Sequence, residues 1–176
     1  QITSALLRFN GIDGMHIVSH GSDGKVQIGS TILSLDSLDT YRNAISAWQY
    51  SMSDNADILI YGCNIAESAN GEELLNQLSE LTATDVAGSE NLTGHADLGG
   101  DWDLEYQTGI LETRNAFTDS LIGAWYGTLD ITSNLVLHNQ FDANANDSSG
   151  NNYHGTLTNG ALIDTTAGTN KIGGGK

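Results

Sequence analysis

Three short apolar runs, separated by longer amphipathic segments, dominate the first 130 residues. The runs cover residues 15–19, 57–61 and 85–89; each is too short for a stable helix and is bounded by turn residues. Apolar residues recur every three or four positions across 38–48 and again across 71–81, which predicts two amphipathic helices. Strands joined through helices of this length pair in parallel, whereas a two-residue turn reverses the chain. We therefore expect an α/β domain in which helices cover a mainly parallel sheet.

Shorter elements are predicted around this framework. Residues 1–9 place apolar side chains on one helical face. Residues 25–29 and 31–35 predict a small hairpin. Residues 98–106 alternate around two glycines, which predicts a further hairpin or a strand with a bulge.

The charge balance narrows the range of partners. The chain carries 22 acidic and 6 basic side chains, a formal net charge of −16. Such a surface repels phosphate backbones, so nucleic acid is not an expected partner. The sequence contains no run of about eighteen apolar residues, so no membrane span is expected. The single cysteine excludes an internal disulfide.

Composition changes near residue 130, where Asn, Asp, Gly, Ser and Thr become dominant and helical periodicity ends. We expect an α/β domain over 1–127, a linker over 128–133 and the start of a β domain over 134–176. The chain begins with Gln1 and shows no basic-then-apolar leader. These features predict a window cut from a longer protein, incomplete at both ends.

Two of the apolar runs end in residues that can do chemistry. His20 follows the first run and Cys63 follows the second, and both are next to a glycine. The carboxyl ends of parallel strands meet at one edge of a sheet, where an imidazole can activate a thiol as a nucleophile. The backbone N–H groups of Gly21 and Cys63 are candidates for stabilising an oxyanion. The alternative is a structural His and a buried, inert Cys.

Other polar residues are weaker candidates. Ser89, Asp101 and Trp102 are predicted by position to line a substrate pocket, although indole is more often part of a core. Asp23 either orients His20 or is a solvated turn residue. His16 and His20 are about 13 Å apart on an extended strand, too far to share one zinc ion.

The segment from 134 contains a partial calcium-loop pattern. Asp142, Asn144 and Asn146 have the spacing of the first half of an EF-hand loop. Asp147 stands where that loop needs Gly, and Tyr153 stands where it needs a bidentate Glu. These three residues are calcium candidates, and a solvated turn is the alternative.

The paired His-Gly and Gly-Cys strand ends resemble those of clan CD cysteine peptidases, the caspase and gingipain-like fold. The longer strings at 17–24, 61–66 and 99–105 resemble a domain of very large, repeat-rich bacterial surface proteins. The resemblance implies a caspase-like three-layer sandwich that lacks its N-terminal strands here. It also implies that His20 is the general base and Cys63 the nucleophile, with no cofactor.

The C-terminal segment is similar to the opening of laminin-G and concanavalin-like jelly rolls. Phe141-Asp142 precedes the turn Asp147-Ser148-Ser149-Gly150-Asn151, and His154-Gly155 follows. About 43 residues are too few to close such a jelly roll, so this segment is expected to be truncated. The resemblance implies a lectin-like neighbour that binds glycans or proteins.

Two functions remain open at this point. The first is a cysteine peptidase-like domain of an extracellular bacterial surface protein or adhesin. Its substrates would be peptides or proteins, among them its own parent chain. The second is a non-catalytic adhesion or anchoring module with the same fold. A reactive Cys63 beside His20 distinguishes the first from the second.

Overall fold

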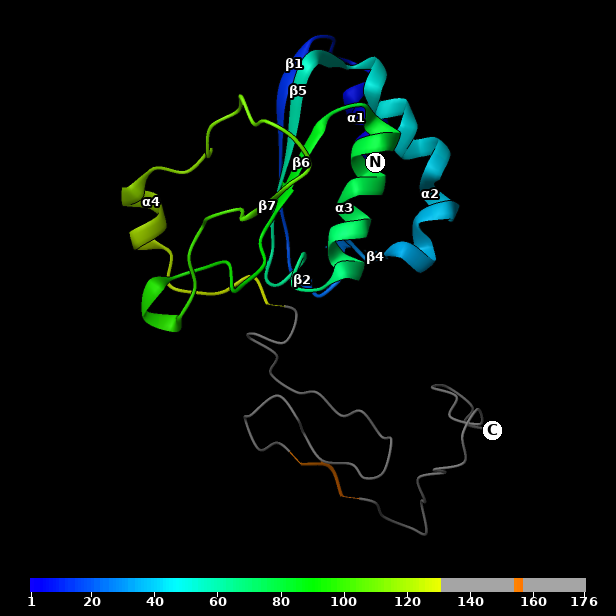
Figure 1. The fold of residues 1–176 in the computed structure, drawn as a ribbon. Helices are drawn as coiled ribbons and strands as arrows, with labels where there is room; N and C mark the ends of the chain where they lie inside the picture. The colour runs from blue at the N-terminus through cyan, green and yellow to red at the C-terminus, as the bar shows by residue number, and fades with distance from the viewer. Residues whose placement is uncertain (131–153, 157–176) are drawn as a thin grey trace. The chain divides into compact units, whose positions relative to one another are not determined.

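A mainly parallel sheet organises the computed structural model, which describes residues 1–130 and 154–156 (Figure 1). Its strand order is β1-β5-β6-β7. The strands are β1 (Ile12–Val18), β5 (Met52–Tyr61), β6 (Asp85–Gly88) and β7 (Tyr106–Gln107). The first three pair in parallel and β7 is antiparallel. The predicted α/β class with a mainly parallel sheet is thus confirmed.

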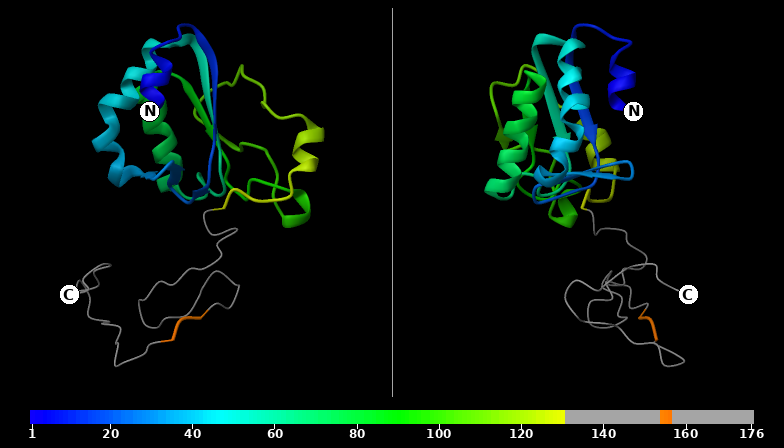
Figure 2. Two further views of the ribbon diagram at one scale, coloured as in Figure 1. Left: turned by 180° about the vertical axis from the view of Figure 1, so that it is seen from behind. Right: turned by 90° about the vertical axis from the view of Figure 1, so that its right-hand side faces the viewer.

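The helices that precede β6 cover one face of this sheet (Figures 1 and 2). They are α1 (Ile2–Leu6), α2 (Leu35–Ser46), the short 3₁₀ helix η1 (Ala47–Tyr50) and α3 (Ala69–Thr82). The helix at the N-terminus is therefore shorter than the predicted 1–9. As predicted, α2 and α3 are the crossovers between the parallel strands.

The other face is covered by irregular chain from residue 89 to residue 130 (Figures 1 and 2). It includes the 3₁₀ helix η2 (Ala96–Leu98) and α4 (Asp119–Ala124). A small antiparallel sheet of β2 (Gly21–Ser22), β3 (Lys25–Ile28) and β4 (Thr31–Leu33) contains the predicted hairpin.

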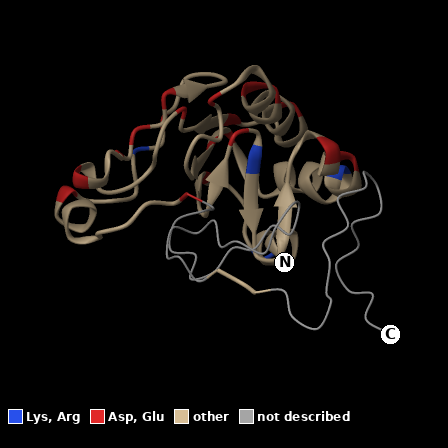
Figure 3. Ribbon diagram, turned by 90° about the horizontal axis from the view of Figure 1, so that it is seen from below, with Lys and Arg blue, Asp and Glu red and all other residues tan. Residues whose placement is uncertain are grey.

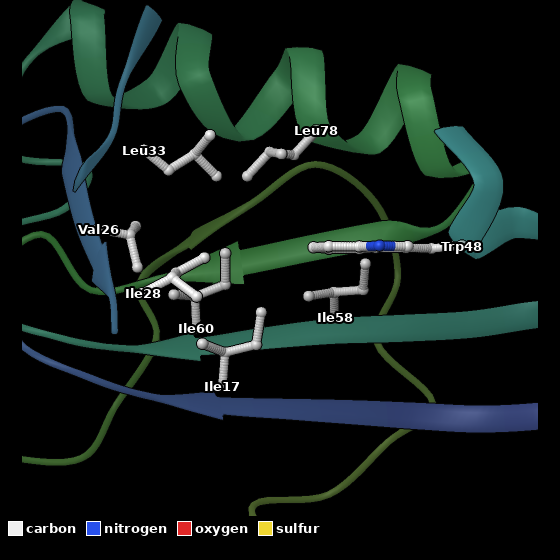
Figure 4. Close-up of a pocket in the computed structure, with 8 residues that line it drawn as sticks. All are labelled: Ile17, Val26, Ile28, Leu33, Trp48, Ile58, Ile60 and Leu78. Atoms are coloured by element: carbon white, nitrogen blue, oxygen red, sulfur yellow. The ribbon is translucent and has the colours of Figure 1, made fainter. Parts of the chain in front are cut away.

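From Ala56 to Tyr61, strand β5 is buried on both faces, as expected for a central parallel strand. Alternate side chains point to opposite faces, so Ile58 and Ile60 pack toward the helices while Leu59 and Tyr61 pack toward the irregular segment. In Figure 4, Ile58 and Ile60 point from β5 toward Leu78 of α3. The cavity that these side chains line is only about 10 Å³, and its lining is apolar, so a water molecule there would find no hydrogen-bond partners.

The hairpin predicted over 98–106 is wrong. Only Tyr106 and Gln107 join the sheet, against β6. The preceding chain pairs instead with an earlier loop, because Gly94 N–H donates to the Asp101 carbonyl and Asp101 N–H donates to the Leu92 carbonyl. Alternation of residue types alone did not identify which partner this chain would take.

The chain separates into two units, Gln1–Ile131 and Thr132–Lys176. The predicted jelly-roll segment, including Asp142, Asn144 and Asn146, lies outside the described residues except at 154–156. Within the described part, no helix is both long and apolar enough to cross a membrane. Acidic side chains are spread over the first unit, and basic ones are few (Figure 3).

Candidate functional site

His20 and Cys63 lie at the ends of two paired strands. Val18 of β1 is opposite Tyr61 of β5, and Ser19 N–H donates to the Tyr61 carbonyl at 3.0 Å, so the pairing continues past both strands. A Cβ on Gly21 would lie 2.9 Å from the Cys63 carbonyl oxygen. The segments that follow β1 and β5 therefore remain in contact at the positions of His20 and Cys63.

The Cys63 thiol is fully buried and faces the irregular segment. It packs with Leu59, Tyr61 and Leu129, and its Sγ donates a 3.5 Å hydrogen bond to the Thr93 carbonyl. Burial raises the pKa of the Cys63 thiol, and the charge of a nearby carboxylate adds to the rise. The thiol is therefore protonated at neutral pH in this conformation.

His20 is partly buried and anchored through one ring nitrogen. Its Nδ1 lies 2.9 Å from the Asp130 carbonyl oxygen, which only accepts hydrogen bonds. Nδ1 must therefore hold a hydrogen, and the neutral ring has its lone pair on Nε2. This is the tautomer that a general base needs. Within the described residues no hydrogen bond joins His20 to Cys63.

The chain at Thr128–Asp130, here called the covering segment, lies against both residues. The carbonyl of Leu129 accepts from Gly21 N–H at 2.9 Å, and Leu129 N–H donates to the Thr93 carbonyl at 2.9 Å. Asp130 forms a parallel bridge with Gly21 and Thr128 an antiparallel bridge with Gly94. The covering segment is thus held by backbone hydrogen bonds, and its Leu129 packs against Cys63.

An apolar groove of about 310 Å³ adjoins the covering segment. It is lined by Val18, Trp102, Phe117, Leu121, Ile122, Trp125 and Leu129. The Trp102 ring lies 4.7 Å from that of Phe117 and 5.5 Å from that of Trp125, between ring centroids. Trp102 Nε1 is buried and has no hydrogen-bond partner in the described part of the chain.

One family model matches nearly all of the first unit. Residues 1–129 match a family described as a domain of unknown function, DUF4347. The chain belongs to this family. No curated protein and no solved structure matches it.

The other residues predicted for a pocket in this DUF4347 domain take different places. Trp102 lines the groove, whereas Ser89 is fully buried and donates to the Asn91 carbonyl at 3.1 Å. Asp101 accepts from Asn91 Nδ2 at 3.1 Å and from the Asp103 N–H at 3.0 Å. Ser89 and Asp101 therefore bind neighbouring loop residues and do not line the groove.

Asp23 does not orient His20 in the described structure. Its Oδ1 accepts from the Ser68 N–H at 3.1 Å and from the Ser68 hydroxyl at 2.8 Å. Ser68 is the N-cap of α3, so Asp23 holds the small sheet against the start of that helix.

Sequence reasoning missed most of the groove. Phe117 and Trp125 come from a region without regular periodicity, and their approach to Trp102 depends on long-range packing. The sequence signal was the clustering of aromatic residues after position 100. Sequence reasoning also missed the role of the covering segment, because residues 128–133 were predicted to be a linker.

Proposed function

We propose that the DUF4347 domain is a latent cysteine peptidase-like domain whose first substrate is its own chain. In this proposal Cys63 is the nucleophile, His20 is the general base, and the cleaved bond joins Leu129 to Asp130. One observation carries the proposal: Gly21 N–H, the candidate oxyanion donor, already donates to the Leu129 carbonyl. The family match also ends at residue 129.

The chemistry follows from these positions. Once its proton has passed to His20, the Cys63 thiolate attacks the carbonyl carbon of Leu129. Gly21 N–H stabilises the oxyanion, and His20 returns the proton to the Asp130 nitrogen as the C–N bond breaks. Water then hydrolyses the thioester and leaves fragments 1–129 and 130–176.

The burial of the Cys63 thiol explains why the proposed peptidase is latent. A protonated, fully buried Cys63 with no hydrogen bond to His20 is a poor nucleophile. Catalysis therefore requires the covering segment to shift enough for His20 Nε2 to reach the thiol. Such a shift also lets other peptides enter.

The groove suggests which peptides fit. Leu129 lines it together with aromatic and aliphatic side chains, so an apolar residue before the cleaved bond is favoured. The likeness of the two strand ends to those of clan CD peptidases supports a caspase-like three-layer sandwich around this site. The separate likeness of the strings at 17–24, 61–66 and 99–105 to repeat-rich surface proteins supports a parent protein at a bacterial surface, where an adhesin that processes itself would release or expose its neighbouring domain.

The test uses the full chain. Intact-mass measurement over time is expected to show fragments 1–129 and 130–176 from the wild-type chain and none from Cys63→Ala or His20→Ala. A peptide electrophile with leucine next to the reactive group is expected to label Cys63, and more slowly in His20→Ala. Absence of cleavage together with absence of His20-dependent labelling would reject the peptidase assignment.

The second candidate is a non-catalytic adhesion or anchoring module. The complete burial of Cys63 and the raised pKa of its thiol favour it, because they are typical of a structural cysteine. In that case Leu129→Ala accelerates the modification of Cys63 by the same factor for a simple alkylating reagent and for the peptide electrophile. His20→Ala then leaves both rates unchanged.

A further inference from the structure

Three carboxylates lie close together toward the end of the sheet that is opposite to Cys63. Asp57 of β5 and Asp85 of β6 are direct partners in the parallel pairing, and Glu112 comes from the chain after β7. Each offers a carboxylate oxygen, and these oxygens all lie within 4.8 Å of one another. Three negative charges this close repel one another strongly unless a cation or protons lie between them.

Asp57 supplies a second, separate observation. It is fully buried, and its Oδ2 accepts the backbone N–H groups of Glu112 at 2.9 Å and Thr113 at 2.6 Å. Its Oδ1 is also buried but finds no hydrogen-bond partner among the described residues. A buried carboxylate oxygen without a partner raises the free energy of the folded state, and a bound ligand would remove this penalty.

No salt bridge in the described part of the chain neutralises these three carboxylates. In residues 1–130 and 154–156, the salt bridges join Arg42 to Asp39 and His95 to Asp97, and neither involves the cluster. Two backbone N–H groups already occupy Oδ2 of Asp57, and one oxygen from each of the three carboxylates lies within 4.8 Å of the others. A cation from solution would neutralise them without any change in the fold.

The local backbone is shaped around the cluster. A Cβ on Gly109 would lie 2.1 Å from Asp85 Oδ1, so the lack of a side chain at Gly109 lets the backbone lie against the Asp85 carboxylate in this conformation. Asp85 and Glu112 also line an open pocket of about 220 Å³, together with Asp54. Asp85 and Glu112 are therefore reachable from solvent through this pocket, whereas Asp57 is buried behind it.

We propose that Asp57, Asp85 and Glu112 bind a calcium ion. Calcium–oxygen distances of 2.3–2.6 Å place two ligand oxygens at most about 5 Å apart, and the three oxygens satisfy this limit. The donor set is all oxygen, which disfavours zinc. Calcium accepts carboxylate oxygens in a flexible geometry, whereas magnesium demands a near-ideal octahedron with shorter bonds, so calcium is the better match. The ion would tie the chain at 109–113 to β5 and β6.

The experiment measures calcium binding to the full chain after treatment with EDTA. Calorimetric titration and thermal unfolding are expected to show calcium binding with a rise in Tm, and a much smaller effect of magnesium. Asp85→Asn and Glu112→Gln are each expected to weaken calcium binding by about tenfold or more. Glu73→Gln removes an exposed carboxylate of α3 and is the matched control, expected to bind as the wild type does.

The variants locate the site within the chain. Asp142, Asn144 and Asn146 are intact in all of them, so calcium bound there would persist in Asp85→Asn and Glu112→Gln. Undiminished binding in both variants overturns the proposal, as does a wild-type chain whose Tm is unmoved by calcium. A Tm that rises at acid pH but ignores calcium indicates a proton shared between carboxyls, which also overturns it. Because Glu112 is exposed, Glu112→Gln is expected to fold and keeps the test decisive.

Discussion

Replacing Leu129 with Ala tests whether the covering segment is what protects Cys63. Leu129 is 8 % exposed, packs against the thiol, and its backbone is held by Gly21 and Thr93. The substitution leaves the backbone hydrogen bonds in place and removes only the apolar contact. It should therefore loosen the covering segment without altering the sheet.

The expected effect follows from the burial of Leu129. Leu→Ala at a buried site costs about 2–5 kcal/mol, and a residue at the edge of a cluster belongs in the lower part, about 2–3 kcal/mol. Cys63 is fully buried, so a reagent reaches it only when the segment opens. Each 1.4 kcal/mol changes the opening equilibrium about tenfold, so the thiol should react about 30- to 150-fold faster.

The assay is the rate of modification of the native chain by a small disulfide reagent. The chain has one cysteine, so the whole signal reports Cys63. Leu78→Ala is the matched control: Leu78 is 3 % exposed, lies on α3 and packs in the other cluster, away from the thiol. Equal acceleration by both substitutions would mean that the thiol is exposed by global unfolding, and the covering-segment reasoning would fail.

Three further predictions concern stability. Gly71→Ala should lower the free energy of unfolding by about 1–3 kcal/mol, because a Cβ there would lie 2.0 Å from the Ile65 carbonyl and this clash outweighs the helix propensity of Ala; denaturant titration measures it. Burial raises the pKa of Cys63, so stability should fall as pH rises above about 8.5, and Cys63→Ala should flatten that fall in melts across alkaline pH. Burial lowers the pKa of His16, so the unfolded chain takes up that proton first and stability should fall as pH drops below about 6.5. His16→Phe keeps the stacking on Tyr61 and should reduce the acid loss, and an unchanged acid limb would contradict the assignment.

The parallel framework could be predicted because its signals are local. Apolar runs at 57–61 and 85–89 correspond to strands, and the helix periodicity at 38–48 and 71–81 corresponds to α2 and α3. Each of these segments buries a face whose spacing is visible in the sequence. Parallel pairing then followed from the lengths of the connections.

The irregular face could not be predicted in the same way. Within 98–106, Asp101 pairs through its backbone with Leu92 and Gly94, a choice that depends on tertiary packing. The carboxylate cluster was missed for a similar reason. Asp57 and Asp85 read as ordinary strand-end residues, and only the register of β5 with β6 and the return of Glu112 bring them together.

The two candidate sites are linked by a loop more directly than by the strand they share. Asp57 and Cys63 are six positions apart on one chain, about 20 Å when extended, and β5 is paired on both sides, so it cannot bend easily. The loop that Asp57 holds through Thr113 N–H continues to Phe117, which packs on Tyr61 at 5.1 Å between ring centroids and lines the groove. A cation that fixes the loop at Asp57 would restrict Phe117 and thereby one wall of the groove. Calcium is therefore expected to slow modification of Cys63 in the full chain, whereas coupling through a rigid strand alone would leave that rate unchanged.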